Sequence, residues 1–114
     1  MERLRKERGF TLIELMIVIL IVGILVGIAV PVFVSARASA SRRVCQANIR
    51  TLKSACGAFN ASTGTYPSDV GDLVPEFLQK TPTCPELGTT DSYHFEGGGG
   101  NTPPVISCGY HGTF

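Results

Sequence analysis

The side chains best suited to chemistry are four cysteines and two histidines, all in the second half or near the middle of the chain. They are Cys45, Cys56, Cys84, Cys108, His94 and His111. Four thiols in 114 residues are typical of an oxidising compartment, where disulfides persist. No cysteine pair has C-x-x-C spacing, and neither histidine lies in an H-E-x-x-H motif. We therefore expect no metal, no cofactor and no catalytic residue, with both histidines on the surface or on a strand.

The pairing of the cysteines stays open. Cys45 and Cys56 are 11 residues apart, which on an unbroken helix is about 16 Å and beyond the roughly 7 Å limit between disulfide-bonded Cα atoms. Three arrangements remain: Cys45–Cys84 with Cys56–Cys108, Cys45–Cys108 with Cys56–Cys84, or Cys84–Cys108 with two buried thiols. A disulfide between the helix and the C-terminal residues 61–114, which we call the head, would typically stabilise a small domain by about 2–4 kcal/mol.

Glu14 is the other chemically unusual residue, because it precedes a long apolar run. Leu15 to Val34 carries no charge over 20 residues, which spans roughly 30 Å as a helix, the thickness of a bilayer core. An acid at the bilayer centre costs roughly 2.5–3.5 kcal/mol on insertion scales, and less near an interface. Pro31 lies inside the run, lacks the N–H that would bond residue 27, and predicts a kink or local melting.

After Val34 the apolar residues recur on one helical face, at Cys45, Ile49, Leu52, Cys56 and Phe59. The pattern predicts one helix from about Thr11 to Phe59, ending near residues 60–64 before Tyr66-Pro67.

The remaining residues have weaker signals. Ser68-Asp69 is a plausible cap for a short helix, and residues 93–95 and 105–108 are the two strand-like runs. We expect two or three short antiparallel strands, with Gly97–Gly100 as a flexible loop. The head is too small to fold unaided and should rest on the helix.

The charge is divided into zones. Residues 1–9 carry a net +2, residues 37–53 carry +5, and residues 61–114 carry −5. A basic stalk thus precedes an acidic head. These cations could contact the acidic heads of neighbouring molecules, and this is a simpler explanation for them than DNA binding. Direct nucleic-acid contact is therefore not favoured.

Residues 8–15, RGFTLIEL, resemble the processing motif of type IV pilins and of type II secretion or competence pseudopilins. The resemblance continues to Pro31 and covers about the first third of the chain. A secretory signal cleaved after Ala40 is the rival, but its apolar region would be too long and would contain Glu14.

The resemblance implies a role for each motif residue. A prepilin peptidase would cut after Gly9 and methylate the amino group of Phe10. Glu14 would guide assembly by meeting a neighbour's amine, and Pro31 would mark where the helix melts on packing.

The implied fold is α+β and pilin-like: a cleaved leader (1–9), a transmembrane and filament-core helix (10–34), an amphipathic helix (35–60) and a small disulfide-supported head (61–114). The implied function is a structural, non-enzymatic subunit of a type IV pilus or pseudopilus serving secretion, DNA uptake, adhesion or motility. Its partners would be copies of itself, other subunits, membrane lipid, the peptidase and a membrane assembly platform. The leader would be cytoplasmic and the head extracytoplasmic, first at the inner membrane and then in a filament.

Two alternatives remain: a minor or initiating pilin, and a single-pass membrane protein whose head binds a ligand without polymerising. The sequence does not choose between pilus, secretion and competence roles.

Overall fold

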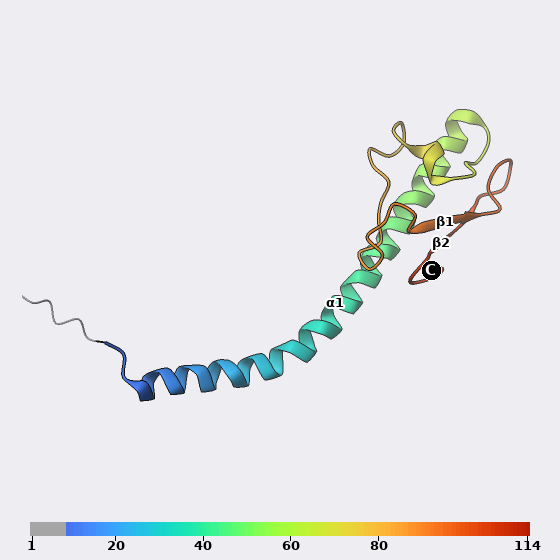
Figure 1. Cartoon of the computed structure of the whole chain (residues 1–114). Helices are drawn as coiled ribbons and strands as arrows, with labels where there is room; N and C mark the ends of the chain where they lie inside the picture. Colours follow the sequence, from blue (N-terminus) through green and yellow to red (C-terminus); the bar gives the residue numbers. More distant parts are fainter. Residues whose placement is uncertain (1–8) are drawn as a thin grey trace, which may run out of the picture. The chain divides into compact units, whose positions relative to one another are not determined.

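The computed structural model describes residues 9–114, so eight of the nine residues of the expected leader lie outside the described part. One helix, α1 (Leu12–Thr63), makes up about half of that part (Figure 1). It continues one turn beyond the predicted end at Phe59. Gly64 then stops it, with φ of 83° and its N–H donating to the carbonyl of Asn60 at 2.7 Å. A glycine in this left-handed conformation is a common way to end a helix.

The N-terminal part of α1 is a separate compact unit that reaches to Ala36. Pro31 lies inside the helix, and α1 continues through it without interruption. The local melting predicted there is not observed in the single chain. One missing hydrogen bond is tolerated because helical residues on both sides hold the ladder cooperatively.

The second unit runs from Arg37 to the C-terminus and contains the hydrophobic core. The predicted stripe is confirmed, since α1 contributes Cys45, Ile49, Leu52, Ala55 and Cys56 to the core. Phe59 packs against this core and meets the ring of Phe77 edge-on, with 5.5 Å between centroids. Nearly half of the core therefore belongs to the helix.

The rest of the core comes from a short 3₁₀ helix, a two-stranded sheet and Cys84 on the loop between them. The helix η1 (Val70–Leu73) is capped by Asp69, whose carboxylate accepts from the N–H of Val70 at 2.7 Å. Strands β1 (Tyr93–Glu96) and β2 (Val105–Cys108) pair antiparallel, with Tyr93 opposite Cys108. The α+β, pilin-like architecture expected from the sequence is thus confirmed.

The glycine run after β1 differs from the flexible loop that the sequence predicted. Gly100 accepts a hydrogen bond from the N–H of Tyr66 at 2.8 Å, which pairs the run with the chain segment that follows α1. Gly98 approaches the carbonyl of Pro67 so closely that a Cβ atom there would collide with it. The run is a packed part of the head because only glycine permits this backbone approach.

Candidate functional site

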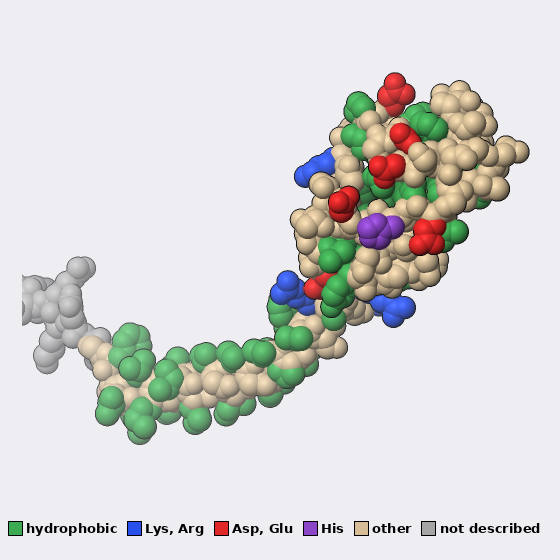
Figure 2. All heavy atoms as spheres, turned by 45° about the vertical axis from the view of Figure 1, so that its right-hand side comes forward, with side chains coloured by type: hydrophobic (Ala, Val, Ile, Leu, Met, Phe, Trp, Pro, Cys, Tyr) green, Lys and Arg blue, Asp and Glu red, His purple; other side chains and the backbone are tan. Residues whose placement is uncertain are grey.

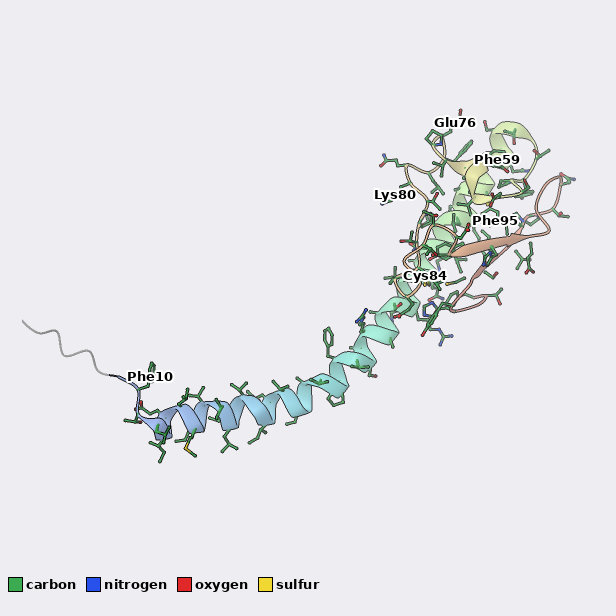
Figure 3. All side chains as sticks on the ribbon, in the orientation of Figure 1. Phe10, Phe59, Glu76, Lys80, Cys84 and Phe95 are labelled. Atoms are coloured by element: carbon green, nitrogen blue, oxygen red, sulfur yellow. The ribbon has the colours of Figure 1, made fainter. Side chains whose placement is uncertain are left out.

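The N-terminal end of α1 places the processing motif in accessible, non-helical backbone. Gly9, Phe10 and Thr11 precede the helix and are exposed, and the side chain of Phe10 is 91% accessible (Figure 3). The Gly9–Phe10 bond therefore lies outside the helix and is exposed, as a bond that a peptidase cuts must be.

Thr11 and Glu14 cap the helix reciprocally. The N–H of Thr11 donates to Glu14 Oε2 at 3.2 Å, and the N–H of Glu14 donates to Thr11 Oγ1 at 3.3 Å. This is a capping box, in which the first and fourth residues each satisfy a free backbone donor of the first turn. The sequence reasoning missed it, although T-x-x-E directly before an apolar run is its usual signal.

The helix surface behind this cap is apolar on every face. All large apolar side chains from Phe10 to Val34 are between 51% and 91% exposed, and Figure 2 shows them along this part of the chain. The helix is long and apolar enough to cross a membrane. Apolar surface exposed all round a helix is stable in lipid or among other helices, but not in water.

Three cysteines that are far apart in the sequence lie together with a histidine in the head. Cys45 of α1, Cys84 of the loop after η1 and Cys108 at the end of β2 are buried side by side, with Cys45 Sγ 2.9 Å from Cys84 Sγ and 3.6 Å from Cys108 Sγ. His111 joins them, its Nδ1 lying 3.7 Å from both Cys84 Sγ and Cys108 Sγ.

Cys56 lies apart from this group. It is buried on the same face of α1, but within residues 9–114 its sulfur has no contact with another cysteine. All four cysteines are free thiols in the structure. The two arrangements that pair Cys56 with Cys84 or Cys108 do not match this geometry, because the loop after η1 and the end of β2 place Cys84 and Cys108 beside Cys45 instead.

The two histidines behave differently. His94 is exposed on β1, as expected, whereas His111 is half-buried against the sulfurs. Cys45, Cys84 and the pair Cys108 and His111 come from three distant segments, so C-x-x-C spacing is not required to bring them together. The local signal for this cluster is Cys108-x-x-His111, which is neither a C-x-x-C nor an H-E-x-x-H motif.

The described part of the chain thus combines one long helix, whose N-terminal part is apolar and capped by an acid, with a small two-stranded head. The family model for the prokaryotic N-terminal methylation motif matches residues 4–30. The chain is also 30% identical, over 117 aligned positions, to the type II secretion system core protein G of Escherichia coli K12. That alignment covers 96% of this chain and 78% of the relative. No solved structure matches the chain significantly.

The protein therefore belongs to the type IV pilin and pseudopilin family. This is a family of structural subunits and not one of enzymes.

Proposed function

We propose that this protein is a filament subunit that is processed at Gly9–Phe10, held in a membrane by the N-terminal part of α1, and then polymerised. The observation that carries the proposal is the uniformly exposed apolar surface from Phe10 to Val34. Lipid covers such a surface before assembly, and the helices of neighbouring subunits cover it afterwards. The similarity to a secretion-system pseudopilin favours a pseudopilus-like filament.

Glu14 has a chemical part in this proposal. In the free chain its carboxylate caps α1 by accepting the N–H of Thr11. A carboxylate has about four acceptor positions, so capping leaves others vacant for an ammonium. Cleavage after Gly9 creates that ammonium on Phe10, and methylation keeps it basic. A neighbour's Phe10 amine would then neutralise Glu14 within the bundle, where an unpaired charge is costly.

Pro31 marks a second step. Its ring denies the carbonyl of Gly27 a hydrogen bond, so α1 can open there at lower cost than elsewhere. We propose that packing into the filament opens the helix at this point. The head would face away from the cytoplasm, with the leader on the cytoplasmic side until it is removed.

The first test is expression of the full chain with and without a prepilin peptidase, followed by mass spectrometry of the mature N-terminus. The expected product begins at an N-methylated Phe10 and appears only with the peptidase. An uncleaved chain, or cleavage after Ala40, contradicts the proposal.

The second test separates the charge of Glu14 from its cap. Glu14→Gln retains an acceptor oxygen for Thr11 but removes the charge, whereas Glu14→Ala removes both. We expect both variants to be cleaved and both to fall at least about tenfold in filament incorporation, as judged by sheared-filament yield. Glu76→Gln, on an exposed acid of the head, is the control that should assemble normally. Normal filaments from Glu14→Gln would refute charge pairing.

A further inference from the structure

Four potential metal ligands from separate segments converge inside the head. They are the three sulfurs of Cys45, Cys84 and Cys108 and the imidazole of His111, and all four ligand atoms lie within 4.8 Å of one another. Figure 3 shows Cys84 on the loop that runs beside α1, the helix that carries Cys45. Three thiols and one imidazole are the donor set of a Cys₃His zinc site.

The distances agree with a tetrahedron around one ion. Zn–S bonds of about 2.3 Å and Zn–N bonds of about 2.0–2.1 Å place neighbouring ligand atoms about 3.6–3.8 Å apart. The Cys45–Cys108 sulfurs are 3.6 Å apart, and His111 Nδ1 is 3.7 Å from each of its two sulfur neighbours. The Cys45–Cys84 edge, at 2.9 Å, would need to lengthen by about 0.9 Å, and the Cys84–Cys108 and Cys45–His111 edges lie within 4.8 Å.

Polar groups lie near two of the sulfurs. The hydroxyl of Tyr93 lies near Cys45, and Asn48 Nδ2 donates to the Tyr93 oxygen at 2.9 Å. The backbone N–H groups of Glu86 and Leu87 lie near Cys84. Metal-bound thiolates need nearby donors, because the second shell orients the ligands and tunes their charge.

A disulfide accounts for the cluster less completely. Three thiols are an odd number, and Cys56 makes no sulfur contact within residues 9–114, so any single bridge leaves one cluster thiol unpaired. A bridge also leaves His111 with at most one thiol beside its Nδ1, whereas the structure places two sulfurs there. A metal ion uses all four groups.

We propose that Cys45, Cys84, Cys108 and His111 bind one structural Zn²⁺ ion that ties the end of β2 and the loop after η1 to α1. Four protein ligands complete the tetrahedron, and the three cysteines are at most 2% exposed, so no position remains for a substrate. The site is therefore structural. It is independent of cleavage and polymerisation.

The test uses the untagged full chain in detergent, purified anaerobically without chelators, with zinc measured by inductively coupled plasma mass spectrometry. We expect one zinc per chain in the native protein and in Cys56→Ser, which removes a buried thiol outside the cluster. Cys84→Ser and Cys108→Ser should lose it. Chelation should lower the unfolding temperature of the native head by about 10 °C.

Cobalt exchange tests the role of His111. Tetrahedral Co²⁺ bound by thiolates has characteristic visible bands, which the native protein should show. His111→Ala should weaken Co²⁺ binding at least about tenfold, whereas His111→Cys should restore it with a stronger sulfur charge-transfer band.

Three results would overturn the proposal. The first is a native chain with reduced thiols that holds no zinc and shows no cobalt–thiolate bands. The second is a disulfide between two of the three cluster cysteines, found by non-reducing peptide mapping of the chain isolated from its own compartment. The third is full zinc content in Cys108→Ser. The first two results are measured on the native chain, so they do not depend on whether a variant folds.

Discussion

Two side chains in this protein, those of Glu14 and Tyr93, each take part in more than one interaction. Glu14 caps the first turn of α1 and is also the acid that we propose meets a neighbour's amine. Tyr93 packs in the core while its oxygen accepts a hydrogen bond from Asn48 Nδ2. At both places a polar group in an apolar setting is paired, because an unpaired buried polar group is expensive.

Tyr93→Phe tests how much the buried hydroxyl contributes to the stability of the head. The change keeps the ring of Tyr93, a residue that is 4% exposed, and removes the oxygen that accepts a hydrogen bond from Asn48. We expect the free energy of unfolding of the head to fall by about 1–2 kcal/mol in urea titrations. Tyr110→Phe, on a side chain that is 61% exposed, should change it by less than about 0.5 kcal/mol. Equal losses in the two variants would contradict this assignment.

At the scale of elements, α1 changes character along its length. Its N-terminal part exposes apolar side chains on every face, and its later part buries a single stripe beneath η1 and the strands. Lipid or neighbouring helices stabilise the former, and the core of the head stabilises the latter. One continuous helix can therefore serve two environments.

Gly98→Ala tests the packed glycine run after β1. The added Cβ atom would overlap the carbonyl of Pro67, which is backbone and cannot rotate away. We expect a loss of about 1–3 kcal/mol in the free energy of unfolding of the head. The control is Gly57→Ala in α1, where a Cβ atom meets nothing within 4 Å.

Gly57→Ala should raise stability by about 0.5–1 kcal/mol, because alanine is the better helix former. Urea-induced unfolding followed by circular dichroism measures both changes. An unchanged free energy of unfolding in Gly98→Ala would show that the glycine run is not tightly packed against Pro67.

At the scale of the whole molecule, the core depends on residues far apart in the sequence. Five of its members lie on α1 between Cys45 and Cys56, and the others lie between Val70 and Cys108. All of them fall within the compact unit that begins at Arg37. The head and the later part of α1 are thus one folding unit.

Two fragments test this division. A chain of residues 37–114 should be soluble, monomeric and cooperatively folded, because it contains the whole core and omits the exposed apolar helix. A chain of residues 61–114 should remain unfolded, since it lacks the five core residues of α1. Thermal circular dichroism and size-exclusion chromatography measure both outcomes. A folded 61–114 fragment would show that the helix is dispensable.

Much of the architecture follows from local pattern. The uncharged run after Glu14, the stripe that begins at Cys45 and the two strand-like runs all predict elements that the structure contains. The glycine run was misjudged, because composition alone does not reveal that Gly98 packs against Pro67. The helix end was placed one turn early, because Asn60, Ser62 and Thr63 are poor helix formers that the helix nevertheless accommodates until Gly64 stops it.

The sequence by itself determined the class of protein, because the apolar run and the motif around Gly9, Phe10 and Glu14 are contiguous and depend on local spacing alone. Only the tertiary structure decided which cysteines meet. Cys45, Cys84 and Cys108 are separated from one another by dozens of residues. His111 follows Cys108 by one turn, and it meets Cys84 only because the end of β2 packs beside the loop after η1. Local periodicity cannot encode such a meeting, since it depends on how helix, loop and strand pack around one core.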